Sequence, residues 1–245
     1  NSDNKQKDSE FSWRFGLVYL SDTGLAPYAT YAKSFLPIVG TDINGTAFQP
    51  ETGELYEIGI KFQPEKINGS VTLSLFELRR QNVLTTDPSN PVNQVQTGEV
   101  RSRGFEAEAV ASFEFGLDLI ASLTLQDVVI TKSNAGDQGN TPTTVPDTAA
   151  ALWADYTIPD GTLGGLGFGG GVRYKGSSFG DAANTFKVNN YVLVDAAVHY
   201  EWEGLKLAIN AENIFNNRHV ASCSSANACF YGTDRTVIGS IGYRW

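Results

Sequence analysis

The feature that most constrains the fold of this chain is an alternation of apolar and polar residues, which recurs in eleven segments. In the third segment, for example, Tyr56, Ile58 and Ile60 alternate with Glu57 and Lys61. Because successive side chains of a strand point to opposite faces, each segment is expected to form a strand with one apolar and one polar surface. The segments lie at residues 11–19, 26–33, 56–62, 71–80, 103–113, 117–126, 149–156, 166–174, 192–200, 205–212 and 236–245.

The connections between these segments alternate in length. Five odd-to-even connections are short, at residues 21–25, 63–70, 114–116, 158–165 and 201–204. Five even-to-odd connections are longer, at residues 34–53, 81–96, 130–147, 175–189 and 214–234. Outer-membrane barrels have short periplasmic turns and long extracellular loops. The pattern therefore predicts an all-β, antiparallel transmembrane β-barrel, in which the C-terminal Trp245 lies at the periplasmic rim.

The composition is compatible with such a barrel. The mean hydropathy is -0.20, and no stretch approaches the ~20 consecutive apolar residues that a membrane-spanning helix needs. A barrel strand spans the bilayer with ~9–11 residues, of which every second one faces lipid, so its mean hydropathy stays low. The net charge of -9, without a basic cluster, disfavours nucleic acid as a partner.

A soluble sandwich or propeller would show the same alternation, so the aromatic residues are needed to separate the two interpretations. Rings with a polar group suit the boundary between membrane and water, although the same rings would also cap the core of a soluble sheet. The aromatic residues that lie near strand ends on the apolar face are Trp13, Tyr19, Phe62, Tyr156, Tyr174, Tyr200, Tyr243 and Trp245.

In the fourth segment, Phe76 and Leu78 interrupt the alternation, and the sequence gives no reason for this.

The number of segments predicts an incomplete barrel. Bacterial single-chain barrels have an even number of strands, and eleven is odd. Eleven is also half of twenty-two, the strand number of outer-membrane transporters with a plugged lumen. We therefore expect residues 1–245 to be the C-terminal half of a 22-stranded barrel, without the plug domain and the first half of the barrel.

Several stretches carry a more specific signal, and their order and spacing coincide with the expected strand ends. From about residue 15 to residue 245, the chain resembles the C-terminal third of a TonB-dependent siderophore receptor, and most closely the ferrichrome receptors. The matching stretches are residues 27–35, 53–62, 82–88, 98–108, 152–156, 176–180, 194–196, 213–216, 220–223 and 229–232.

The resemblance implies a 22-stranded barrel in the outer membrane of a Gram-negative-type cell, with outer-membrane lipid around it. An N-terminal plug would contact the TonB complex, which supplies the energy for uptake. The expected ligand is a ferric siderophore of the hydroxamate type, such as ferrichrome. The resemblance implies no cofactor, no resident metal and no enzymatic activity. The chain would need the missing plug and the missing N-terminal half of the barrel in order to transport.

Cys223 and Cys229 are the only cysteines, and they lie in the last long loop. The predicted topology places this loop outside the cell, where disulfides form, so we interpret the two as a disulfide. The closed loop is short, so its entropy would contribute only ~2–3 kcal/mol, and the bond would shape the loop rather than hold the barrel. Two free thiols are the alternative, and a zinc site with His219 is a weaker one, because a fourth ligand is not evident.

Ligand contacts are expected from aromatic residues of the outer loops, as in the ferrichrome receptors. Phe230 would pack on the chelate and Tyr231 would donate to a hydroxamate oxygen, although either ring could belong to the outer aromatic girdle. Ser224 stands where those receptors carry a phenylalanine that contacts the ligand, which weakens ferrichrome itself as the ligand. Tyr31 and Phe35, at the outer end of the second segment, are weaker candidates.

Arg101, Arg103 and Arg173 are expected to face the lumen or the outer rim, either as contacts for the plug or an anionic ligand or as solvated charges. An outer-membrane enzyme is disfavoured, because His199 and Asp195 share a face but lie about 13 Å apart along a strand. A passive porin-like channel is the other alternative, and it would conduct ions through an open lumen.

Overall fold

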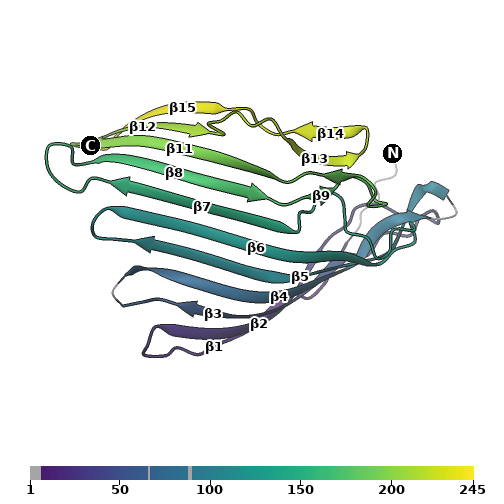
Figure 1. Ribbon diagram of the computed structural model, residues 1–245. Coiled ribbons are helices and arrows are strands. Elements are labelled where there is room, and N and C mark those ends of the chain that lie inside the picture. The colour runs from purple at the N-terminus through teal and green to yellow at the C-terminus, as the bar shows by residue number, and fades with distance from the viewer. Residues whose placement is uncertain (1–6, 66, 88–89) are drawn as a thin grey trace.

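The computed structural model describes residues 7–65, 67–87 and 90–245, and a single curved antiparallel sheet dominates it (Figure 1). Each of the eleven expected segments forms one strand of this sheet, in chain order, so the predicted antiparallel all-β architecture is confirmed. The strands are β1 (Trp13–Val18), β2 (Leu25–Leu36), β3 (Glu51–Phe62), β4 (Asn68–Asp87), β5 (Asn90–Ser112), β6 (Leu117–Lys132), β7 (Thr148–Thr157), β8 (Leu166–Lys175), β11 (Tyr191–Trp202), β12 (Leu205–Glu212) and β15 (Thr236–Tyr243).

Two small hairpins stand outside this sheet. β9 (Ser178–Phe179) pairs with β10 (Lys187–Val188), and β13 (Val220–Ser225) pairs with β14 (Ala228–Tyr231). The sheet is not closed, since its order runs from β1 at one edge to β15 at the other. In the described part of the chain, no helix is long and apolar enough to cross a membrane.

The short connections gather at one end of the sheet, and the long connections gather at the other with both hairpins (Figure 1). We call these the short-turn end and the long-loop end. Residues 81–96 differ from expectation, because they mostly extend β4 and β5 instead of forming a loop. The ladder continues past a register shift between Gln81 and Val83, where the β-branched Val83 and Thr85 favour strand geometry. Residues 88–89, within this connection, lie outside the described part.

One face of the sheet exposes its apolar side chains. Leu17 is 67% exposed, Ile58 58% and Ile241 75%, and each lies on this apolar face. A water-soluble sheet would bury such a face against a second layer, and large exposed apolar patches mark interaction or membrane surfaces. Among the described residues, buried apolar side chains are few: Phe48, Val128, Val188, Leu193 and Cys223. The structure therefore contradicts the interpretation as a soluble sandwich.

On the opposite, polar face, large side chains lie over glycines of neighbouring strands. Phe76 is in register with Gly104, and a Cβ on that glycine would lie 3.0 Å from the Phe76 ring. Leu78 similarly lies 4.0 Å from the position of a Cβ on Gly53. These contacts explain why Phe76 and Leu78 interrupt the alternation. Each side chain fills the space above a glycine of a neighbouring strand, where a larger residue would place its own side chain.

Glycines of β8 also let side chains from two different strands meet. Asp155 on β7 and His199 on β11 are separated by β8, yet Oδ1 of Asp155 lies 2.9 Å from Nε2 of His199. A Cβ on Gly167 would collide with the His199 ring, and a Cβ on Gly169 would lie 2.7 Å from Oδ2 of Asp155. The absence of side chains at these glycines therefore makes the contact across β8 possible.

Two adjacent glycines of β8 provide a matched test of this packing. A Cβ on Gly169 would meet Trp153 and Asp155, whereas a Cβ on Gly170, on the apolar face, would have no heavy atom within 4 Å. Gly169→Ala is expected to lower the free energy of unfolding of the protein by ~1–3 kcal/mol, the usual cost of overpacking. Gly170→Ala should be neutral or slightly stabilising. Urea unfolding in lipid vesicles measures both, and equal midpoints would contradict the packing described.

Candidate functional site

Three long connections meet at the long-loop end near β13 and β14. Asn184 pairs with Thr141 of the preceding loop, accepting from its N–H at 2.8 Å and donating to its carbonyl at 2.9 Å. A Cβ on Gly180 would lie 2.8 Å from Cβ of Cys223, so the loop between β9 and β10 rests on the hairpin β13–β14. Lys175 adds a hydrogen bond from Nζ to the carbonyl of Ala221 at 3.2 Å. The loops therefore form one connected surface.

The loop between β9 and β10 is also stabilised from within. Asp181 accepts from the Thr185 hydroxyl at 2.6 Å and from the Phe186 N–H at 2.8 Å. The hydrogen bond from the Thr185 hydroxyl lowers the pKa of Asp181 below its usual value, and the hydrogen bond from the Phe186 N–H lowers it further. The carboxylate is therefore ionised at neutral pH, the state that accepts both hydrogen bonds.

The two cysteines lie opposite each other in the hairpin β13–β14. Their Cα atoms are 4.0 Å apart and their Sγ atoms 2.01 Å apart, so the structure joins Cys223 and Cys229 by a disulfide. Cys223 is fully buried. Because both sulfurs are used in this bond, they are not free to bind a metal together with His219. Instead, its ring packs on Tyr191 with centroids 4.0 Å apart, and Nδ1 lies 3.0 Å from the carbonyl of Asn217.

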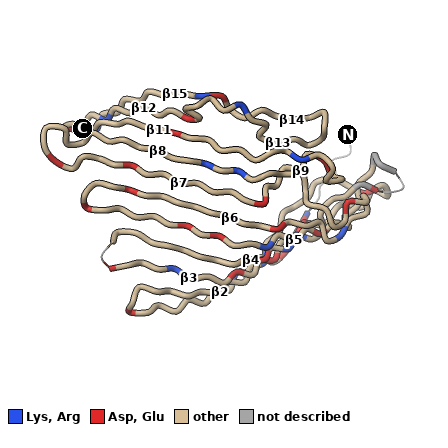
Figure 2. Tube along the Cα trace, viewed as in Figure 1, with Lys and Arg blue, Asp and Glu red and all other residues tan. Residues whose placement is uncertain are grey.

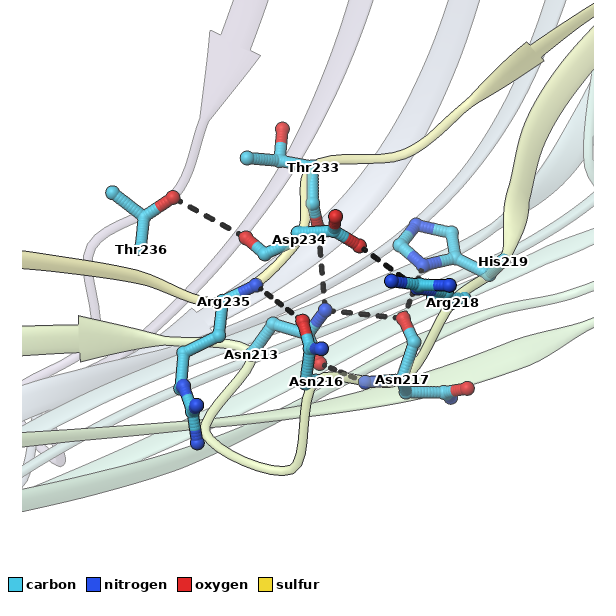
Figure 3. A network of polar contacts seen from close by, with 9 residues as sticks. All are labelled: Asn213, Asn216, Asn217, Arg218, His219, Thr233, Asp234, Arg235 and Thr236. Carbon is cyan, nitrogen blue, oxygen red and sulfur yellow. Dashed lines mark hydrogen bonds and ion pairs between the residues drawn. The ribbon is translucent and has the colours of Figure 1, made fainter.

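One asparagine ties the two ends of the last long loop together. Asn213 follows β12 with φ of 51°, a left-handed conformation that asparagine adopts more readily than most residues. Its Oδ1 accepts from the Asn217 N–H at 2.8 Å (Figure 3). Its Nδ2 donates to the carbonyls of Asn217 and Thr233 at 3.1 and 3.2 Å. Because Asn213 is only 2% exposed, these hydrogen bonds replace contacts with water.

The Asn213 clamp is in turn fixed to the sheet. Oδ1 of Asp195, on β11, accepts from the Asn213 N–H at 2.8 Å. Arg173, on β8, donates from Nε and Nη2 to the two oxygens of Asp195 at 2.6 and 2.9 Å. Asn216, also in a left-handed conformation, accepts from the Arg235 N–H at 2.9 Å (Figure 3). A continuous polar path therefore runs from β8 through β11 to both ends of the loop that carries the disulfide.

An open pocket of about 570 Å³ lies between the end of β8, the start of β11 and the last loop. Its lining includes three aromatic rings, those of Tyr174, Phe186 and Tyr191. Asn190 supplies a hydrogen-bond donor, Nδ2, which lies 3.2 Å from the Tyr174 hydroxyl. The other polar lining residues are Lys187, Asn189, Asn217, Arg218 and His219. The pocket can hold a compact ligand that is rich in oxygen acceptors.

The aromatic lining of this pocket was not among the predicted ligand contacts. Tyr174 is predicted only as part of the aromatic girdle, and Phe186 and Tyr191 are not among the predicted contacts. The available signal was their position, because each flanks or lies within the long connection at residues 175–189.

The predicted contacts Ser224, Phe230 and Tyr231 lie together on the hairpin β13–β14 but outside the pocket lining. Phe230 is 64% exposed and Tyr231 79% exposed, and Ser224 is also exposed. The structure therefore presents these three residues at the long-loop end, where a ligand could reach them.

The predicted contacts Tyr31 and Phe35 lie elsewhere. Both are on the apolar face of β2, near the opposite edge of the sheet from β13–β14. The Tyr31 ring packs between Trp13 and Tyr56, with centroid distances of 4.8 and 4.6 Å. The structure does not bring these two residues together with the last loop, because alternation along β2 directs them to the other surface.

The three arginines occupy two different surfaces. Arg173 lies on the polar face, where it binds Asp195. Arg101 and Arg103 lie on the apolar face, in line with Phe105, but at its long-loop end. Of the two expected positions, the lumen is therefore wrong for Arg101 and Arg103, because the register of β5 assigns odd-numbered residues to the apolar face, and the outer rim agrees with their place at the long-loop end.

Comparison with known proteins gives the family. The family model "TonB dependent receptor-like, beta-barrel" matches residues 1–214. The ferrichrome outer membrane transporter/phage receptor of Escherichia coli (strain K12) is 40% identical over 98% of this chain and 33% of its own length. The ferrioxamine B receptor of Salmonella typhimurium (strain SL1344) is 32% identical over 95% of this chain and 34% of its own.

Solved structures show the same fold. The siderophore receptor PiuA from Acinetobacter baumannii superimposes with a TM-score of 0.81 at 23% identity, over 95% of this chain and 35% of that one. This chain thus spans about a third of the length of the relatives named here. These relatives are outer-membrane receptors and transporters rather than enzymes, so the apolar face meets lipid and the polar face lines the lumen. The chain belongs to the TonB-dependent receptor family, as part of its outer-membrane β-barrel.

Proposed function

We propose that this chain forms part of a TonB-dependent receptor that carries ferric hydroxamate siderophores across the outer membrane. The observation that carries the proposal is the 40% identity, over 98% of the chain, with the E. coli ferrichrome transporter. The ferrioxamine B receptor of S. typhimurium supports the same ligand class at 32% identity. Ferrichrome and ferrioxamine B are different molecules, but both bind iron through hydroxamate groups.

The chemistry of the long-loop end supports this ligand class. The pocket offers aromatic surface from Phe186 and Tyr191 beside donors such as Asn190 and Lys187, and its lining among the described residues includes no carboxylate. A ferric hydroxamate presents apolar backbone and a rim of oxygen acceptors, so donors and rings suit it. Tyr231 on the neighbouring hairpin adds an exposed phenol.

The proposal requires parts of the receptor beyond this chain. A plug in the lumen would pass the pull of the TonB complex to the bound chelate. The edges at β1 and β15 each leave one row of backbone groups unpaired within the sheet. In lipid these groups need partners, so we infer that strands from the other half of the barrel pair with both edges.

Uptake by whole cells tests the ligand class. Cells without other siderophore receptors would carry the full-length receptor and be offered single ferric siderophores under iron starvation. Growth is expected on ferrichrome or ferrioxamine B, and not on a ferric catecholate. Deletion of the TonB protein should abolish this growth. Failure on every hydroxamate would overturn the ligand class, and growth without TonB would favour a passive channel.

The Asn213 clamp predicts a second effect, on affinity. Asn213→Ala removes the three hydrogen bonds that join the buried Asn213 side chain to Asn217 and Thr233, at a cost of ~1–3 kcal/mol, so the loop loses its fixed position. The KM for uptake of the radiolabelled chelate is expected to rise about tenfold, with a smaller effect on the maximal rate. Asn210→Ala is the matched control, since Asn210 lies on β12, the strand that Asn213 follows, and is exposed. Equal KM values for the two variants would contradict this role.

A further inference from the structure

The pocket at the last long loop differs from the rest of the chain in its charge. The chain carries 27 acidic and 18 basic residues, for a net charge of -9. In the described ranges, however, the pocket lining includes Lys187 and Arg218 and no carboxylate. Basic residues also lie toward the long-loop end of β8 and beside β9 and β13 (Figure 2). The pocket is therefore a locally basic site on an acidic protein.

The carboxylates of the surrounding segments are held by other partners. Asp181 accepts hydrogen bonds within its own loop, and Asp195 binds an arginine of β8. Asp234 lies 3.8 Å from Arg218, but both side chains are exposed, so water weakens this ion pair. Lys187 makes no ion pair with any residue that the structure describes. The pocket therefore retains positive charge that the described residues do not neutralise.

His219 gives the pocket shape. Its ring packs on Tyr191 and occupies the space that a Cβ on Gly232 would need. Nδ1 lies 3.0 Å from the carbonyl of Asn217, and a carbonyl only accepts, so Nδ1 carries a proton and donates it. The ring therefore forms a fixed wall beside the two basic side chains.

The net charge of a ferric hydroxamate depends on the groups at its periphery. Three hydroxamate anions neutralise one ferric ion, so the iron centre of a trihydroxamate has no net charge. A free amine elsewhere on the molecule makes the chelate cationic at neutral pH, and a free carboxylate makes it anionic. A carboxylate would neutralise the charge of Lys187 and Arg218, whereas an ammonium group would be repelled.

We propose that the receptor prefers ferric hydroxamates that carry a free carboxylate, and that Lys187 and Arg218 bind this group in the pocket. The inference rests on the proposed function, because it ranks chelates within the hydroxamate class. A carboxylate accepts from the Lys187 ammonium and from two parallel N–H groups of the Arg218 guanidinium. Val220, in the pocket lining, is paired with Tyr231 on the hairpin. An acidic arm can therefore enter the pocket while the iron centre lies against the exposed rings of the hairpin.

Three forms of one chelate test the preference without a change at the iron centre. Ferrioxamine B carries a free amine, acetylation makes it neutral, and succinylation replaces the ammonium by a carboxylate. Isothermal titration calorimetry of the full-length receptor in detergent measures the Kd of each ferric form. The succinyl form is expected to bind about tenfold more tightly than the acetyl form, as for one charge-assisted contact, and the amine form most weakly.

Variants of Lys187 assign the preference to the pocket. The readout is the Kd of the acetyl form divided by that of the succinyl form, because a loss of affinity common to both forms cancels in this ratio. Lys187→Gln should bring the ratio close to one, and Lys187→Arg should preserve it, since arginine keeps the charge. Lys132→Gln is the matched control. It removes the same charge at the long-loop end of β6, outside the pocket lining, where Lys132 pairs with Glu99, and should keep the wild-type ratio.

The outcomes separate this inference from the proposed function. Equal Kd values for the three forms, or tightest binding of the amine form, would overturn the charge preference and leave the proposed function in place. An unchanged ratio in Lys187→Gln would overturn the pocket as the site of the carboxylate. If none of the three forms bound, the hydroxamate ligand class would be wrong, and this inference would fall with it.

Discussion

Every backbone N–H and C=O group in the hydrocarbon region must find a partner inside the protein, and the rest of this structure depends on that constraint. A single antiparallel sheet meets it for the strands between its edges at β1 and β15, because each of them pairs with a neighbour on both sides. The apolar side chains can then face lipid, so a conventional core is not needed. Register is instead supported by local fits on the lumen face, such as Phe76 over Gly104.

The constraint is weaker where the strands leave the membrane. There, side-chain hydrogen bonds hold the chain in place instead of backbone pairing between strands. Asp195 lies within β11 but uses its carboxylate to bind Arg173 on β8 and the Asn213 N–H in the loop. Asn213 then closes the loop onto Thr233. A long loop loses much conformational entropy when it binds a ligand, and a clamp and a disulfide reduce that loss in advance. The rigidity of the sheet is in this way extended to the hairpin that carries Phe230 and Tyr231.

The two faces of the sheet meet different surroundings at the long-loop end. On the lumen side, β8 and β11 present Arg173 and Asp195, whose charges neutralise each other and hold a loop. On the lipid side, β4 and β5 present Arg79 and Arg101 opposite each other, and Glu77 pairs with Arg79.

The sequence alone determined the strands, their order, the end at which the long loops lie and the face that most side chains take. These follow from a period of two and from turn lengths, which are local properties of the chain. It did not determine that β4 extends to Asp87 and that β5 begins at Asn90, because loop and strand compositions overlap there.

Only the tertiary structure decided which residues meet. His199 shares a face with Asp195, but it pairs with Asp155 across the glycines of β8. Tyr31, a candidate for ligand binding, joins the aromatic cluster on the lipid side, and Tyr191 packs on His219 in the pocket. Such contacts depend on the register between strands that are distant in the chain, and a shift of one residue would turn each side chain to the other face. Pairing across the sheet sets that register, which is why the fold could be predicted and most of the site could not.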